Sequence, residues 1–185
     1  PITPKPSIKK EIIVSRSFGH SVSTLKEMSE AVTTFTTRAS LKARKQNTIA
    51  SSVAVFINSS LFNKSINYYA NTMKINLPVP SNSNHLILPS ALFVLRSIFR
   101  SNINYTKCGV LLLGLESADS KQENLWLRES DKDRKLTKVI DEINCKFDKL
   151  SLRSAIQPKK PIWRLKQLRK SPAFTSSWKE LIVAR

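Results

Sequence analysis

The side chains best suited to metal-dependent chemistry are four acids in the C-terminal half of the chain. Two-metal phosphoryl transfer needs carboxylates that converge on one point. These acids instead alternate with basic residues in a segment whose apolar residues recur at helical spacing, which is typical of ion pairs along a solvated helix. We therefore interpret them as a helix surface and predict neither an active site nor a metal site. The acids are Asp131, Asp133, Asp141 and Glu142, among Lys132, Arg134, Lys135 and Lys138.

Thiol and imidazole groups are too few and too widely spaced for a zinc site or a disulfide framework. The chain has two cysteines, Cys108 and Cys145, and two histidines, His20 and His85. Cys108 lies in an apolar run, so we expect a buried structural thiol there. With only three glycines in the chain, no phosphate-binding loop is encoded either. No cofactor is predicted for this chain.

The charge of the chain indicates its class of partner. Its 185 residues hold 31 Lys and Arg against 13 Asp and Glu, a formal net charge of +18. A charge this large favours a polyanionic partner, and nucleic acid is the leading candidate. The alternative is a ribosomal-type protein, or a basic protein whose charge serves only solubility. Of the two, the charge favours nucleic acid.

The chain carries no signal for a membrane. Its longest apolar run, "CGVLLLGL" at 108–115, is far shorter than the roughly 20 residues that cross a bilayer. No basic-then-apolar leader opens the sequence, so a cytoplasmic location is expected. The opening stretch "PITPKPSIKK" (1–10) contains three prolines and has the composition of a linker within a longer protein.

Residues 11–115 are predicted to form one α+β domain. The order strand, helix, strand, strand, helix, strand is a split βαβ pattern, which gives a small four-stranded sheet with two helices on one face. The other face is then free, and its basic residues could seat a nucleic-acid backbone. The predicted elements are strands over 11–18, 49–57, 69–77 and 106–115, and helices over 24–45 and 84–100.

Local signals set the expected ends of these elements. Thr24 and Glu27 have the spacing of a capping box at the start of the first helix. Pro78 and Pro80 are expected to end the third strand, because proline cannot donate a ladder hydrogen bond. Pro89 is expected to delay or kink the second helix.

The composition changes after Leu115. Residues 116–130 form a predicted linker, and 131–185 a predicted helix with a basic tail. The tail from 149 to 185 holds ten Lys and Arg and one acid, with Trp163, Phe174 and Trp178 among them. These aromatics either stack on bases between phosphate contacts or pack the tail onto the third helix. The predicted apolar face of that helix comprises Leu136, Val139, Ile140, Ile143, Phe147 and Leu150.

Four stretches in this order resemble the C-terminal part of the UmuC-type Y-family translesion DNA polymerases: "KKEIIVSRSFG", "EMSEAVTTFTTRASLKARKQ", "NYYANTMKINLPVPSNS" and "LRKSPAFTSSW". The resemblance runs from about residue 8 to about residue 179. It implies that 11–115 is a little-finger-like domain on template–primer DNA, and that 131–185 is a C-terminal extension. The palm with its magnesium-binding acids would lie upstream of Pro1, so the chain alone is expected not to polymerise DNA.

The resemblance also implies partners and a role. DNA is expected to be held without sequence preference, in SOS mutagenesis and DNA repair, with the sliding clamp as a second partner. UmuD-like and RecA-like proteins are further expected partners. The alternative is a free-standing basic adaptor, or a truncated remnant, that binds nucleic acid or protein without polymerase function.

The stretch "SRSFG" falls where the family's strand meets the DNA backbone. An arginine fork and small hydroxyls suit phosphate contacts, which position DNA without reading its sequence. Together with basic residues of the first helix and third strand, this gives a predicted DNA-binding set. Its members are Ser15, Arg16, Ser17, Lys42, Arg44, Lys45 and Lys74.

The stretch "QENLWL" in the predicted linker is similar to the short peptide with which bacterial proteins bind the sliding clamp. It departs from that peptide at Glu123, where Leu is usual, and at Trp126, where Phe is usual. An apolar pair on a linker can fill a partner's cleft as anchors. Alternatively, the pair folds back onto the third helix. The predicted clamp-binding residues are Gln122, Asn124, Leu125, Trp126 and Leu127.

Overall fold

The computed structural model describes residues 10–60, 68–120, 131–147, 151–158, 160–165, 171–178 and 181. Its strands are β1 (Glu11–Val22), β2 (Thr48–Ser59), β3 (Ala70–Ser81) and β4 (Tyr105–Ser117). Its helices are α1 (Leu25–Lys45), α2 (Asn84–Ile98), the short 3-10 turn η1 (Ala118–Ser120) and α3 (Asp131–Lys146).

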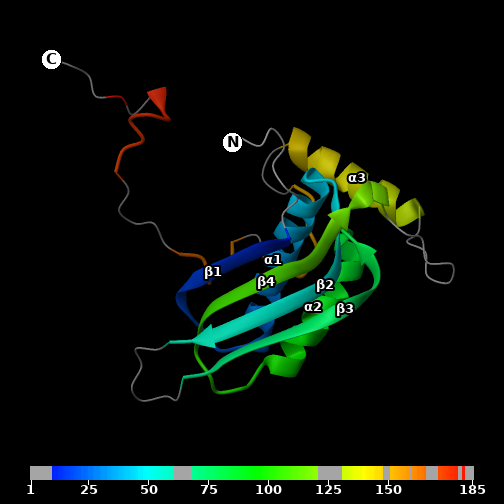
Figure 1. Ribbon diagram of the computed structural model, residues 1–185. Coiled ribbons are helices and arrows are strands. Elements are labelled where there is room, and N and C mark those ends of the chain that lie inside the picture. The colour runs from blue at the N-terminus through cyan, green and yellow to red at the C-terminus, as the bar shows by residue number, and fades with distance from the viewer. Residues whose placement is uncertain are drawn as a thin grey trace, which may run out of the picture.

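The four strands form one antiparallel sheet in the order β1-β4-β2-β3, with α1 and α2 on the same face (Figure 1). This confirms the predicted α+β architecture and its order of elements. The chain starts the sheet at one edge, crosses behind it through α1, and later inserts β4 between β1 and β2. No helix of the described part of the chain covers the opposite face of the sheet.

The core lies between the sheet and the two helices. Strand residues that alternate along the chain, such as Val14, Val55 and Val110, point to the helices and are buried. Helix α1 presents Met28 and Phe35 to them, at the spacing of one helix face. Strands β2 and β4 are the two central strands of the sheet. They supply many of the core residues and are therefore rich in apolar side chains.

The start of α1 follows its predicted capping signal in a modified form. The Oγ1 atom of Thr24 accepts a hydrogen bond from the backbone N–H of Glu27 at 3.2 Å. The Thr24 hydroxyl in turn donates to the Glu27 carboxylate at 2.8 Å. The two side chains are thus bonded to each other, which fixes the first turn of the helix.

Strand β3 is longer than predicted, since it continues through Pro78 and Pro80 to Ser81. The prediction was wrong because β3 is an edge strand and needs ladder bonds on one side only. The pairing with β2 also shifts between Ala50 and Ser52, so the prolines stand in a bulge where regular donors are not required.

Strand β1 likewise extends past Gly19 to Val22, with a register shift between Ser17 and Val22. In the second helix, Pro89 neither delays the start at Asn84 nor ends the helix, which closes at Ile98. Beyond that end, the Tyr105 hydroxyl accepts from the Arg100 N–H at 2.9 Å and donates to its carbonyl at 3.1 Å.

The C-terminal segment, defined as the described residues between 131 and 165, packs on the helix side of the domain (Figure 1). The Gln157 amide donates to Thr37 Oγ1 of α1 at 3.0 Å. Trp163 is buried in the domain's core cluster, where its ring contacts Phe18 and Phe35 edge-on. Among the described helices, none is long and apolar enough to cross a membrane.

Candidate nucleic-acid interface

The open face of the sheet, meaning the face without helices, carries four cross-strand rows. Its polar side chains are mainly short hydroxyls and amides, and its apolar ones lie mainly on β4 and in the middle of β2, with Ile13 on β1. Such a surface lets a nucleic-acid backbone approach closely. The rows are Glu11–Leu113–Ser52–Asn76, Ile13–Leu111–Ala54–Lys74, Ser15–Gly109–Phe56–Thr72 and Ser17–Lys107–Asn58–Ala70.

At the centre of the open face, an aromatic ring packs on a glycine of the neighbouring strand. The Phe56 ring lies over Gly109, where an added Cβ would stand 2.3 Å from the ring and 2.6 Å from the Ser15 Cβ. Only glycine leaves room for this arrangement. The Lys107 ammonium stands 5.8 Å from the Phe56 ring centroid, within the range of a cation–π interaction. The ring therefore holds a lysine charge above the face.

Two cations flank this centre. Lys107 lies in the row of Ser17, and Lys74 on the edge strand β3 lies in the row of Ile13. Both lysines are exposed, as are Ser17 and Thr72. Of the predicted DNA-binding residues, the structure thus brings Ser15, Ser17 and Lys74 together on one face.

Arg16 does not share that face. It pairs with Cys108 in the β1–β4 register, and Cys108 is buried under the helices. Because successive side chains of a strand point to opposite faces, Arg16 projects to the helix side while Ser15 and Ser17 project to the open face. The three consecutive residues of "SRS" therefore lie on two different faces of the sheet and do not form one site.

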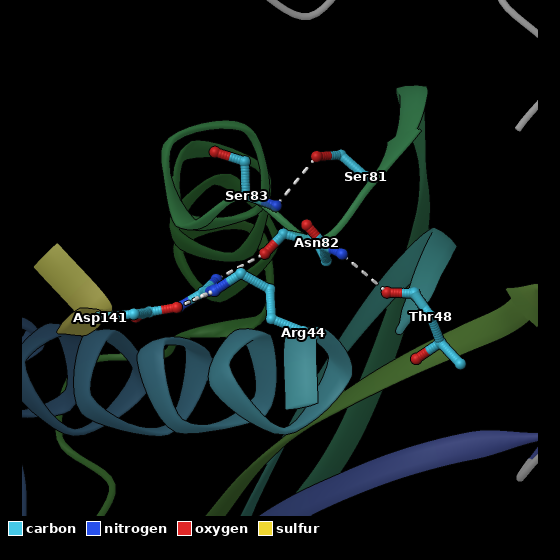
Figure 2. Close-up of polar contacts among 6 residues, drawn as sticks. All are labelled: Arg44, Thr48, Ser81, Asn82, Ser83 and Asp141. Atoms are coloured by element: carbon cyan, nitrogen blue, oxygen red, sulfur yellow. Dashed lines mark hydrogen bonds and ion pairs between the residues drawn. The ribbon is translucent and has the colours of Figure 1, made fainter. Parts of the chain in front are cut away.

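Lys42, Arg44 and Lys45 lie in the last turns of α1, in the helix layer and away from the open face. Lys42 and Lys45 are exposed. Arg44 is held between two partners, as Figure 2 shows: its Nη2 donates to the Asp141 carboxylate of α3 at 2.9 Å, and its Nη1 to the Asn82 carbonyl at 2.7 Å. Its guanidinium is therefore engaged inside the molecule.

The same junction joins α1 to the corner between β3 and α2 (Figure 2). The Asn82 amide donates to the Thr48 carbonyl at 2.9 Å, and the Ser83 N–H to the Ser81 hydroxyl at 2.9 Å. Arg44 thus links α3 to a corner that these two hydrogen bonds already stabilise. Its role in this structure is to dock the C-terminal segment.

The acids of the sequence analysis are spread along α3. Asp141 binds Arg44, and Glu142 lies 4.0 Å from Lys138 one turn earlier, an exposed helical ion pair. In the part of the chain that the structure describes, no three His, Cys, Asp or Glu side chains gather as metal ligands. Cys108 is buried as predicted, and burial raises the pKa of its thiol, whereas Cys145 is exposed.

The predicted clamp-binding residues fall outside the described residues. Gln122, Asn124, Leu125, Trp126 and Leu127 all lie in 121–130, between η1 and α3. Their assignment stays a prediction from sequence.

Several residues of possible function are not among those predicted from sequence. A sequence pattern could have identified Lys107 and Phe56, since both follow the period-two alternation of their strands and share the open face with Ser17 and Ser15. No such pattern points to Arg38 and Arg164, because they come together only through the docking of the C-terminal segment. The predicted packing of Trp163 on the third helix is wrong, since its ring contacts Phe18 of β1 and Phe35 of α1 instead.

Two family models match the chain. The impB/mucB/samB family C-terminal domain matches residues 9–125, and a domain of unknown function, DUF4113, matches residues 134–184. The first therefore covers the sheet domain, and the second covers most of α3 and the tail. Neither is a catalytic palm domain.

Curated relatives match along nearly the whole chain. Protein UmuC of Salmonella typhimurium is 31% identical over 176 residues, which cover 94% of this chain and 42% of the relative. Protein MucB of Escherichia coli is 32% identical over 181 residues, which cover 97% of this chain and 42% of the relative. The chain thus spans about two fifths of the length of these relatives.

A solved structure described as a complex of the beta-clamp processivity factor and the little finger domain of PolIV also matches, at 13% identity and a TM-score of 0.45. The match covers 63% of this chain and 99% of that one. Family membership rests on the sequence matches: the chain belongs to the impB/mucB/samB family of UmuC-like Y-family polymerases and comprises their C-terminal little finger domain with the DUF4113 region.

Proposed function

We propose that this chain is the DNA-holding and partner-docking region of a translesion DNA polymerase that acts in SOS mutagenesis and DNA repair. The observation that carries the proposal is the open face, on which Ser15, Ser17, Lys74 and Lys107 surround a flat aromatic centre. Membership in a family of UmuC-like proteins supports it.

The chemistry of this face suits the backbone of DNA rather than its bases. Hydroxyls and ammonium groups contact phosphate oxygens, and such contacts position a duplex without reading its sequence. A net charge of +18 adds long-range attraction for any polyanion. Sequence-independent holding is what a polymerase needs when its template is damaged. The proposed site of action is accordingly the bacterial cytoplasm, at the nucleoid.

Catalysis is assigned to a palm domain that neither matched family model includes. Magnesium would be bound by that domain and not by this chain. Residues 1–185, given Mg²⁺, primed template and nucleotides, are expected to extend no primer. Extension that disappears on changing Asp131 or Asp141 would contradict the assignment.

The sliding clamp is the proposed second partner, through the peptide at 122–127. The support is its sequence alone: Leu125 and Trp126 supply two apolar anchors, and Gln122 a polar group for the rim of a cleft. UmuD-like and RecA-like proteins are further proposed partners.

A salt titration of DNA affinity tests the open face. If about four phosphates are contacted, affinity for primed duplex should fall roughly a hundredfold between about 50 and about 200 mM salt, with little dependence on sequence. Lys74→Ala and Lys107→Ala should each reduce the log–log slope by about one. Lys138→Ala on α3 is the matched control and should leave the slope nearly unchanged. A strong sequence preference with a flat salt response would overturn the proposal.

Clamp docking is tested by a paired substitution. Leu125→Ala with Trp126→Ala should weaken clamp binding by at least about 2 kcal/mol, because two anchors are lost, while melting temperature and DNA affinity barely change. Leu136→Ala, at an exposed apolar position of α3, is the control and should bind the clamp normally. A double variant that melts much earlier, yet binds the clamp as before, would assign the pair to the protein's own core.

A further inference from the structure

Three arginines from distant parts of the chain converge on the helix side of β1. Arg16 comes from β1, Arg38 from α1 and Arg164 from the C-terminal segment. We call them the arginine cluster. All three arginines are exposed.

An aromatic triad of Phe18, Phe35 and Trp163 positions the cluster. The Trp163 ring centroid lies 5.9 Å from that of Phe18 and 5.5 Å from that of Phe35, both in edge-on geometry. Arg16 stands two residues before Phe18 on the same side of β1, and Arg38 follows Phe35 by about one helical turn. The neighbour of Trp163 in the chain is Arg164. Each arginine thus lies within three residues in sequence of one ring of the triad, and Arg16 and Arg164 are both near enough to Arg38 to lower its pKa.

The backbone of the C-terminal segment is fixed at the same place. The Gly19 N–H of β1 donates to the Trp163 carbonyl at 2.9 Å. A Cβ on Gly19 would stand 2.7 Å from the Arg164 carbonyl oxygen and 2.9 Å from the Leu165 Cα. Glycine at this position is what lets the segment lie against β1, as the orange ribbon does in Figure 1.

The three charges repel one another. The pKa of Arg38 is lowered, first by partial burial and then by the guanidiniums of Arg16 and Arg164. Within the described residues, no hydrogen bond or ion pair links any of the three to an acid. An arrangement of like charges held by a packed aromatic core is stabilised when an oxyanion binds between them.

We propose that Arg16, Arg38 and Arg164 form a second phosphate site, which takes the backbone of DNA where it passes the β1 edge of the sheet and which the C-terminal segment completes. The proposal rests on the DNA-holding function proposed above. It adds a contact outside the open face and gives the DUF4113 region a part in binding DNA.

The position of the cluster favours DNA over an acidic protein. β1 is an edge strand, and Ser15 and Ser17 face the open side of the strand whose Arg16 faces the helix side. A backbone that leaves the open face over this edge meets the cluster next. The guanidinium fork also matches two phosphate oxygens at once. A carboxylate-rich peptide would find no such continuation.

The first experiment measures DNA affinity of the full chain across salt concentrations for Arg38→Gln, Arg164→Gln and the double variant. We expect the log–log slope to fall by about one for each lost phosphate contact. Arg96→Gln, an exposed arginine of α2, is the matched control and should not change it. If the double variant keeps the wild-type slope while Lys74→Ala with Lys107→Ala lowers it, the second site is wrong and the open face stands. The reverse pattern would overturn the open face alone.

A second measurement separates the two classes of polyanion. Poly-glutamate of matched charge replaces DNA in the same titration. If Arg38→Gln with Arg164→Gln weakens poly-glutamate binding but leaves DNA binding unchanged, the cluster takes carboxylates and the proposal is overturned. Loss confined to DNA supports it.

Gly19→Ala tests whether the C-terminal segment completes the site. This change removes no charge and no aromatic ring, but its Cβ collides with the backbone at Arg164 and Leu165. The salt slope should fall as it does in Arg164→Gln, and adding Arg164→Gln to it should have no further effect. Full additivity of the two changes would show that Arg164 acts without docking at Gly19.

Discussion

The sheet domain and the C-terminal segment are held in place by different means. The sheet domain buries a continuous core between four strands and two helices. In the C-terminal segment, α3 leaves Leu136 58% exposed and Val139 48% exposed. The segment instead borrows the core of the domain through Trp163, which is only 5% exposed, and adds polar ties at Gln157 and Asp141.

This difference indicates a one-way dependence. A helix that buries little of its own apolar face derives its order from what it docks on. The C-terminal segment should therefore lose its structure when its anchors are removed, whereas most of the sheet domain's core should persist. The two family models match separate stretches, 9–125 and 134–184, yet Trp163 of the second packs in the core of the first.

The largest contrast is expected in thiol reactivity. Cys108 in β4 is buried and its pKa is raised by burial, while Cys145 in α3 is exposed. Reactivity follows the accessible thiolate, so the native protein should be labelled at Cys145 at least about a thousandfold faster than at Cys108. Mass spectrometry after maleimide labelling gives both rates. Similar rates would mean that β4 opens as readily as α3.

Removal of the aromatic anchor should have the next largest effect. Trp163→Ala should reduce the free energy of unfolding by about 3 kcal/mol, because a buried ring is lost from contact with two others. Urea denaturation followed by circular dichroism measures it. Trp178, at 91% exposure, offers the matched control, since Trp178→Ala should change stability little. Equal effects of the two substitutions would contradict the docking of the segment through Trp163.

The ion pair between Arg44 and Asp141 should contribute less to the free energy of unfolding than Trp163 does. Arg44→Ala or Asp141→Ala should each cost about 1–2 kcal/mol, since the pair is partly exposed at 16% and 28% and is stabilised by charged hydrogen bonds. A double-mutant cycle by urea denaturation should yield a coupling energy above about 0.5 kcal/mol. Strict additivity would show that α3 docks without this pair.

The exposed pair on α3 should have the smallest effect. Lys138 and Glu142 are 4.0 Å apart and both well exposed, so solvent screens their attraction. Glu142→Gln should alter stability by less than about 0.5 kcal/mol, measured in the same urea assay. A larger loss would mean that Glu142 has a partner beyond its own helix.

The elements of the sheet domain could be predicted from sequence because their signals are local. Alternation along β1 and the recurrence of Met28, Val32 and Phe35 along α1 depend only on which face is buried. The same alternation assigns Arg16 to the helix side, because Arg16 is in phase with the buried Val14 and Phe18.

What could not be predicted depends on contacts between distant segments. No local pattern links Arg44 to Asp141 or Trp163 to Phe35, since each pair meets only after the chain has folded. The path of β3 through Pro78 and Pro80 also depends on its place at the edge of the sheet. Sequence therefore indicated which residues are basic, but not which of them the fold leaves available.

The hydrogen bond from Gly19 to the Trp163 carbonyl also bears on self-association. A sheet has two open edges, and unpaired edge groups are templates for pairing with another chain. Here β3 is blunted by Pro78 and Pro80, whereas β1 is covered at Gly19 by the C-terminal segment. A chain cut before Trp163 would keep the prolines on β3 but lose the segment that covers β1. Edge-to-edge association between copies would therefore begin at β1.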